Sequence, residues 1–224
     1  MALFPGPDSP AYRAWSAAAD VVILNVLTLA GCLPVVTAGA SLTACARVAG
    51  EMAAEGDPAV VSTWWRSFRL NLRQSLAWWL PLLVLTALGA WEYLVLADGA
   101  VGAGQESVRP GQGDALAGLV LAGGVLLVSI LVWLLPLVAF FEASVARHLS
   151  NAVRLAVAHL GATALALVIV SVPVAVLWVL PVMRAAGAWF MVLIGPALQA
   201  YLIALLQRST IAGLTVAASS SPDS

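Results

Sequence analysis

The chain has 224 residues, of which 62% are hydrophobic and 9% are charged, with a formal net charge of −1. A soluble domain carries about 25% charged residues, so this chain has too few to cover a water-facing surface, and its solvent must be largely lipid. Nucleic-acid binding is not expected, because there is no surplus of basic side chains to neutralise phosphates.

The first apolar span is predicted at residues 21–47. Ser9-Pro10 ahead of it is typical of a helix start, with serine as the N-cap and proline in the first turn. Pro34 and Gly39 interrupt the span, and a proline both lacks a backbone donor and crowds the preceding turn. We therefore expect a kink or a break, which leaves open whether the span crosses once or forms a re-entrant hairpin.

The stretch 64–79, WWRSFRLNLRQSLAWW, predicts an amphipathic helix lying at a membrane surface. Its arginines recur at the i, i+3, i+7 spacing that places them on one narrow arc. Guanidinium groups at this depth lie among lipid headgroups, with indole rings just below them. The predicted membrane-interface residues are Trp64, Trp65, Arg66, Arg69, Arg73, Trp78 and Trp79.

Four further spans of about 20 apolar residues are predicted at residues 76–96, 115–141, 160–182 and 188–206. In the span 115–141, Gly118 and Ala122 have the small-xxx-small spacing typical of close helix contact. A glycine-rich stretch, 98–114, is expected to be an exposed loop. Residues 1–216 are thus predicted to form a single all-α membrane domain, a polytopic bundle of about five transmembrane helices with cytoplasmic amphipathic interface helices, followed by a disordered tail at 217–224.

Every predicted span contains a proline. Broken helices line cavities in many transporters, but proline is also common in membrane helices generally. The predicted helix breaks are Pro34, Gly39, Pro81, Pro136, Pro173 and Pro196.

The arginines are distributed unevenly between the connections. The first and third connections carry six (Arg47, Arg66, Arg69, Arg73, Arg147 and Arg154), whereas the second and fourth carry Arg109 and Arg184. The positive-inside rule places the arginine-rich connections in the cytoplasm, with the N-terminus outside and the C-terminus inside. A re-entrant first span would move the N-terminus to the inside.

Asn25 and Gln199 are the polar side chains deepest in the apolar spans. They predict either interhelical hydrogen bonds or, together with Thr37, an intramembrane polar site. Near the span ends, Glu92 and Glu142 are candidates for interfacial ion pairs, and Glu142 is placed to pair with Arg147 or with an arginine of the first connection.

Metal and catalytic motifs are absent from the sequence, which contains no HExxH, Walker or GxSxG pattern. On one helix, His148 and His159 would be three turns apart. Cys32 and Cys45 would be about 20 Å apart, too far for a disulfide, whose Cα atoms lie within about 7 Å. We therefore expect no enzyme activity, no cofactor and no metal.

Two segments carry a resemblance to a known family. LNVLTLAGCLPVVTAGASLTACARV (Leu24 to Val48) and FRLNLRQSLAWW (Phe68 to Trp79) resemble the YesL-like family of bacterial integral membrane proteins, a group defined by a domain of unknown function. The family often carries lysines in the linker where this chain has only arginine, which preserves the charge.

The resemblance implies a multi-pass protein of the bacterial inner membrane, often associated with carbohydrate uptake. The first functional hypothesis is a non-enzymatic accessory subunit that contacts ABC transporter permease subunits in the lipid bilayer. The alternative is a small stand-alone transporter or channel for a neutral solute. The sequence leaves open whether copies of the chain form a homo-oligomer.

Overall fold

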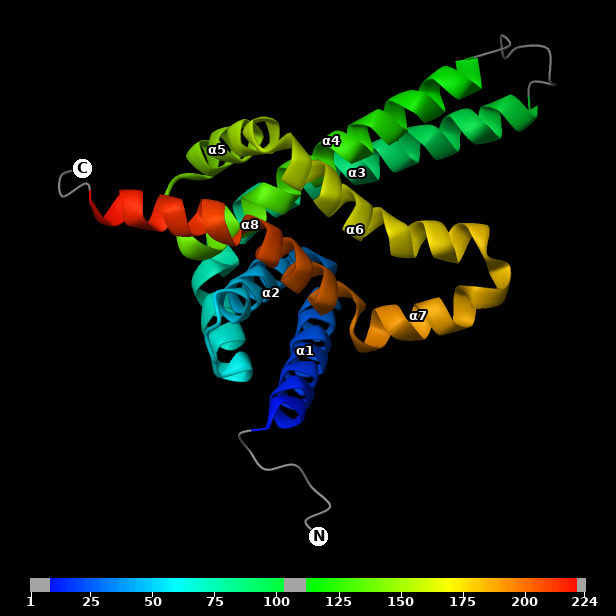
Figure 1. Ribbon diagram of the computed structural model, residues 1–224. Helices are drawn as coiled ribbons and strands as arrows, with labels where there is room; N and C mark the ends of the chain where they lie inside the picture. Colours follow the sequence, from blue (N-terminus) through cyan, green and yellow to red (C-terminus); the bar gives the residue numbers. More distant parts are fainter. Residues whose placement is uncertain (1–8, 103–111, 221–224) are drawn as a thin grey trace.

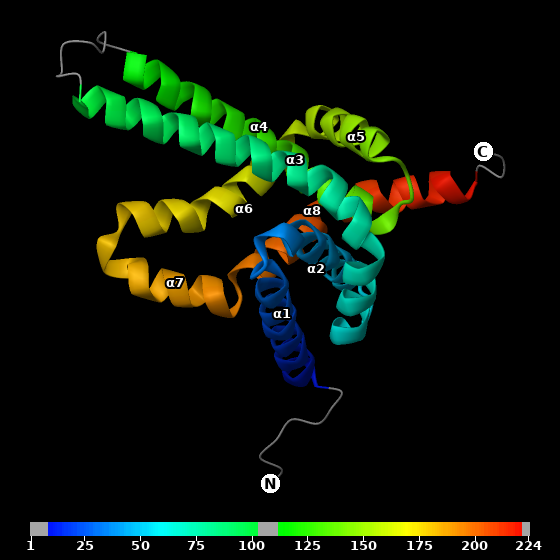
Figure 2. The same ribbon diagram turned by 180° about the vertical axis from the view of Figure 1, so that it is seen from behind.

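The computed structural model of the chain describes residues 9–102 and 112–220, and the regular elements within those ranges are all helices. Figure 1 shows a packed centre around α2, from which two pairs of helices project as separate arms, and the view from behind in Figure 2 shows the same arrangement. The fold is therefore all-α, as the composition predicts.

Helix α1 (Pro10–Cys32) begins where the sequence predicts. Ser9 is the N-cap and its Oγ accepts a hydrogen bond from the N–H of Tyr12 at 3.2 Å. The helix ends just before Pro34, and a 3₁₀ turn, η1 (Val35–Thr37), follows. The predicted interruption at Pro34 is thus a true helix end.

Helix α2 (Ala38–Ala53) runs back along α1, so that the two form an antiparallel hairpin. The Oγ of Ser41 donates a hydrogen bond to the carbonyl of Thr28 at 2.7 Å, and Leu24 packs with Val48 in one buried cluster. The single long span predicted at 21–47 is corrected to two helices. Small residues on α2 allow the close packing: Ala38, Gly39, Ala40, Ser41, Ala44 and Ala49 are all buried.

Helix α3 (Val60–Gly102) joins the predicted interface helix and the second span in one element of 43 residues. Its first half packs antiparallel on α2, where Thr43 Oγ1 and Ser75 Oγ lie 3.4 Å apart. The indole N–H of Trp79 donates to the carbonyl of Val35 at 2.7 Å. Gly39 permits this approach, since a Cβ at that position would lie 2.8 Å from the Cβ of Trp79.

The second half of α3 and the first half of α4 (Gln112–Phe140) form the α3–α4 arm, residues 80–102 and 112–131. The loop predicted at 98–114 is shorter than expected, because α3 continues to Gly102 and α4 begins at Gln112; residues 103–111 lie outside the described ranges. An isolated glycine destabilises a helix by only about 1 kcal/mol relative to alanine, so the glycines in this stretch do not end the two helices. Gly118 has open space around it, so the close helix contact predicted there is not observed.

Four elements complete the described chain: α5 (Val145–Ala158), α6 (Leu160–Val179), α7 (Arg184–Leu193) and α8 (Gly195–Ser219), with a 3₁₀ turn, η2 (Pro181–Met183), between α6 and α7. The α6–α7 pair forms the second arm (Figure 1), closed at its tip by Arg184 Nε, which donates to the carbonyl of Leu177 at 3.0 Å. Helix α8 extends to Ser219, past the predicted start of the tail at 217, and residues 221–224 are not described.

The larger buried cluster surrounds Trp133 of α4, whose side chain is fully buried. Its indole N–H donates to Thr163 Oγ1 of α6 at 2.9 Å. One residue earlier, the carbonyl of Val132 accepts a hydrogen bond from Gln207 Nε2 of α8 at 3.0 Å. Hydrogen bonds therefore tie three helices together inside apolar packing, where water is not available as a partner.

The prolines divide into two groups. Pro34 and Pro196 lie at helix boundaries, whereas Pro81, Pro136 and Pro173 lie inside continuous helices. The breaks predicted at those three are not observed, because one missing N–H removes a single bond and the helix continues on both sides. Gly39 lies inside α2 as well, at a point of close contact and not at a break.

Within the described residues, five helices are long and apolar enough to cross a membrane: Ala14–Cys32, Val60–Trp91, Gly118–Phe140, Leu160–Val179 and Gly195–Ala217. The number agrees with the prediction, and the fourth span agrees closely in its bounds. The fifth is displaced, because the break predicted at Gly195-Pro196 separates α7 from α8 and only α8 is long enough by itself. The two arginine-rich connections lie beside each other, since Gln74 Nε2 of α3 donates to the carbonyl of Ala143, just before α5, at 2.8 Å.

Candidate functional site

The predicted interface residues on α3 separate into an outward and an inward group. Arg66, Arg69 and Arg73 are all exposed, and none forms an ion pair with another described residue. Trp65 lies with them and is 52% exposed. These four side chains are the predicted interface residues that lie on the exposed side of α3.

The other tryptophans belong to the interior. Trp64 and Trp78 are 3% and 9% exposed and lie in the two buried clusters, and Trp79 is half-buried with its indole bonded to Val35. The paired tryptophans thus contribute more to packing than to the membrane surface. Helical spacing relates the buried residues of α3, which are Val60, Trp64, Ser67, Ser75 and Trp78. This periodicity is the sequence signal that could have predicted which tryptophans face inward.

A hollow of about 690 Å³ opens beside this arginine face. It lies where α2, α3 and the connection from α4 to α5 meet, and we call it the polar hollow. Its polar lining includes Arg47 and Glu51 of α2, Arg66, Asn71 and Gln74 of α3, and Glu142 of the connection.

Arg47 is held on three sides. Its Nε lies 2.6 Å from Glu51 Oε1, its Nη1 donates to the carbonyl of Ala139 at 3.1 Å, and its guanidinium carbon lies 4.5 Å from the centre of the Phe140 ring. Ala139 is in the last turn of α4, where carbonyls lack helical partners and carry partial negative charge. Arg47 therefore caps α4 and fixes α2 against it.

Arg66 and Glu142 have no such partners. Both side chains are exposed and line the polar hollow, and neither forms an ion pair with a described residue. The ion pair expected between Glu142 and an arginine is therefore not observed, although Glu142 does share the hollow with two arginines of the first connection. The side chain of Glu92 is outside the described part of the chain.

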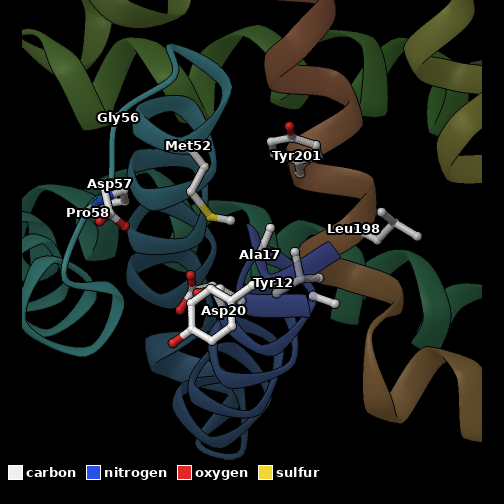
Figure 3. A pocket seen from close by; sticks show the side chains of 12 residues that line it. Tyr12, Ala17, Asp20, Met52, Gly56, Asp57, Pro58, Leu198 and Tyr201 are labelled. Atoms are coloured by element: carbon white, nitrogen blue, oxygen red, sulfur yellow. The ribbon is translucent and has the colours of Figure 1, made fainter. Parts of the chain in front are cut away.

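A second hollow, of about 560 Å³, lies beside the C-terminal end of α2. Figure 3 shows its walls, with Tyr12 and Asp20 from α1, Met52 and Asp57 from the end of α2 and the linker after it, and Leu198 and Tyr201 from α8. Two carboxylates and two phenol rings in one hollow can accept hydrogen bonds and attract cations. The sequence contained no local signal for this grouping, because its three walls come from distant segments.

Asn25 is fully buried at the junction of α7 and α8. Its Nδ2 donates to the carbonyl of Val192 at 2.7 Å, and its Oδ1 accepts from the N–H of Ala197 at 3.0 Å. The helix break at Ile194 frees both of these backbone groups. Asn25 thus supplies the hydrogen bonds that the break removes.

The three residues predicted as an intramembrane polar site do not share one cavity. Gln199 Nε2 donates to the carbonyl of Ile169 on α6 at 3.0 Å, and Thr37 Oγ1 donates to the carbonyl of Gly31 in the last turn of α1 at 2.8 Å. Neither of the two hollows is lined by Asn25, Thr37 or Gln199. The contacts of all three are those of structural hydrogen bonds.

Cysteine and histidine offer no metal site within 9–102 and 112–220, where no group of three or more His, Cys, Asp or Glu side chains could hold an ion. Cys32 and Cys45 are free thiols on different helices of the hairpin, so the separation expected for one helix does not apply. His148 is 1% exposed, and its Nε2 has no partner among the described atoms. Burial lowers the pKa of this imidazole below its ordinary value of 6.5.

Five apolar helices, a basic amphipathic surface and hydrogen bonds buried between helices define a multi-pass helical membrane protein. Residues 21–93 match the family described as "Protein of unknown function, DUF624". The match runs from within α1 into the α3–α4 arm, so it contains Asn25, Arg47 and Arg66. No curated protein and no solved structure matches the chain.

Proposed function

We propose that the chain is a non-enzymatic accessory subunit of a carbohydrate ABC uptake system in the bacterial inner membrane. The proposal rests on the resemblance of Leu24 to Trp79 to the YesL-like family, within the stretch that matches the family of unknown function. The structural observation that supports it is the exposure of the two arms.

The α3–α4 arm is apolar and exposed on both of its helices. Leu85, Leu88 and Trp91 of α3 are 68%, 59% and 69% exposed, and Leu119 and Leu126 of α4 are 70% and 63% exposed. The arm diverges from the α6–α7 arm (Figure 1), so its outer faces are not covered by this chain's other described helices. Lipid also solvates apolar side chains, but helices with open flanks leave room for the spans of another protein to pack against them.

A stand-alone transporter for a neutral solute is the second candidate, supported by the helix break between α7 and α8. Transporters use the free backbone groups of broken helices to bind their solutes. Here the side chain of Asn25 already forms hydrogen bonds with the carbonyl of Val192 and the N–H of Ala197, so these groups are not free to bind a solute. This contact favours the accessory role over the transporter.

Co-purification tests the accessory role. The tagged chain is extracted in mild detergent from cells that express a carbohydrate importer, and permease subunits are detected in the eluate. Gly89→Trp adds bulk on the arm at a position with open space, and Gly213→Trp is the matched change on α8. We expect the first to remove the permease and the second to retain it, and an eluate without any importer component would refute the role.

Flux across liposomes that contain only this protein tests the alternative. Uptake of a labelled sugar above that of protein-free vesicles would favour a stand-alone transporter. No flux across a panel of sugars is the result expected from an accessory subunit.

A further inference from the structure

The polar hollow contains two unpaired charges of opposite sign. Arg66 contributes a guanidinium from α3, and Glu142 contributes a carboxylate from the connection after α4. The cation of Arg47 in the same hollow is already satisfied by Glu51, by the Ala139 carbonyl and by the Phe140 ring. The hollow is thus complementary to a ligand that carries one anionic and one cationic group.

Uncharged acceptors in the hollow extend this complementarity. The Nε2 of Gln74 donates a hydrogen bond to the Ala143 carbonyl, and the Nδ2 of Asn71 donates one to the Ser67 carbonyl at 3.0 Å. Their amide oxygens are directed to no described donor, and each can accept a hydrogen bond. A primary ammonium brings three N–H donors, which suits a carboxylate with amide oxygens nearby.

The side chains around Arg66 favour a position of the hollow at the level of the membrane surface. Arg66 is on the same exposed face as Arg69 and Arg73, with the exposed ring of Trp65 beside it. Arginines next to an interfacial tryptophan are typical of the headgroup region. Lipid headgroups are the most concentrated zwitterions at this depth.

We propose that the polar hollow binds a phosphoethanolamine group, with the phosphate on Arg66 and the ammonium on Glu142. Guanidinium and phosphate form charge-assisted, often bidentate hydrogen bonds. A phosphocholine group fits the same phosphate contact but has no N–H to donate to the carboxylate. The source of the group is either the phosphatidylethanolamine of the bilayer or a soluble phosphoethanolamine ester.

Native mass spectrometry of the full chain tests the proposal. The protein is loaded from mixed micelles with equal amounts of phosphatidylethanolamine and phosphatidylcholine, and retained lipids are counted. We expect preferential retention of phosphatidylethanolamine by the wild type, loss of the preference in Glu142→Gln, and a fall of about tenfold in the retention of both lipids in Arg66→Gln, as for the loss of a hydrogen bond to a charged group.

Two matched variants serve as controls. Arg69→Gln removes the same charge from the same helix, and Glu55→Gln removes a carboxylate from the connection before α3, and neither residue lines the polar hollow. Both should retain lipid as the wild type does. Equal retention of the two lipids by the wild type, or equal losses in the control variants, would overturn the proposal.

Competition on the wild type needs no variant and separates the two sources. Soluble phosphoethanolamine and phosphocholine are added at millimolar concentration to protein loaded with phosphatidylethanolamine. Retention of the lipid indicates the headgroup as the source, and displacement by phosphoethanolamine alone indicates the soluble ester at the same site. Displacement by both compounds equally would contradict any recognition of the ammonium.

Discussion

The side chain of Asn25 accepts a hydrogen bond from the backbone N–H of Ala197, 172 residues further along the chain. With its amide nitrogen on the carbonyl of Val192, the same residue bridges the end of α7 and the start of α8. One polar side chain on α1 thereby holds together a helix break in a different part of the bundle.

Asn25→Leu should destabilise the fold by about 1–3 kcal/mol, because it removes the partner of the buried Ala197 N–H and of the part-buried Val192 carbonyl. The lower end applies if the membrane-embedded groups find other partners, as they often do. Reversible unfolding in mixed micelles measures the change. Thr86→Val is the control, since the Thr86 hydroxyl bonds only to carbonyls of its own helix, and a similar loss in that variant would contradict the bridging role.

Gly39→Ala and Gly89→Ala should change stability in opposite directions. A Cβ at residue 39 would lie 2.8 Å from the Cβ of Trp79, an atom that no side-chain rotation can move, so α2 and α3 must separate. A Cβ at residue 89 meets nothing within 4 Å, and alanine improves on glycine in a helix by up to about 1 kcal/mol. Thermal unfolding of the purified variants measures both, and equal shifts would argue against close packing at Gly39.

Stability should fall as the pH drops below about 6.5, because of His148. Burial lowers the pKa of this imidazole from 6.5, so the folded chain keeps it neutral while the unfolded chain binds a proton. The unfolded state therefore holds more protons, and the free energy of unfolding rises with pH through this window. His148→Phe should flatten the dependence below about pH 7, whereas an unchanged slope in the variant would assign it to other groups.

The α1–α2 hairpin predicts that the N-terminus and the connection after α2 lie on one side of the membrane. In a background of Cys32→Ser and Cys45→Ser, single cysteines are introduced by Ser9→Cys or Ala54→Cys. An impermeant maleimide applied to intact cells should label both or neither, with labelling after lysis as the reactivity control. Labelling of only one of the two would mean that α1 crosses and α2 does not return, which is the N-outside topology first expected from the arginines.

Composition and periodicity were enough for the large features. Apolar length predicted five spans, and Ser9-Pro10 predicted the first helix start, because both depend on neighbours in sequence. Pro34 predicted a break for the same reason. The return of the chain along α1 after this break depends on the packing of α2 against α1, which no local pattern specifies.

The contacts of the two hollows were not predictable in this way. Arg47 reaches Ala139 across 92 residues, and Asp57 and Tyr201 line the same hollow only because α8 returns to the α1–α2 hairpin. Arg47 and Glu51 were the exception, since their i, i+4 spacing is that of a helical ion pair. The tryptophan pairs differ for a related reason: adjacent residues on a helix point about 100° apart, so Trp64 is buried where Trp65 is exposed, whereas Trp78 is buried and Trp79 is half-buried.

The continuous course of α3 has a mechanical consequence. Its 43 residues, at about 1.5 Å each, follow a helical path on the order of 64 Å long, roughly twice the thickness of the hydrocarbon layer. The helix bends between its two halves (Figure 2) but has no break, so we expect that a protein or a thinner bilayer that tilts its apolar end moves its arginine end as well. Events among the acyl chains are thereby transmitted to the surface without any loop changing its shape.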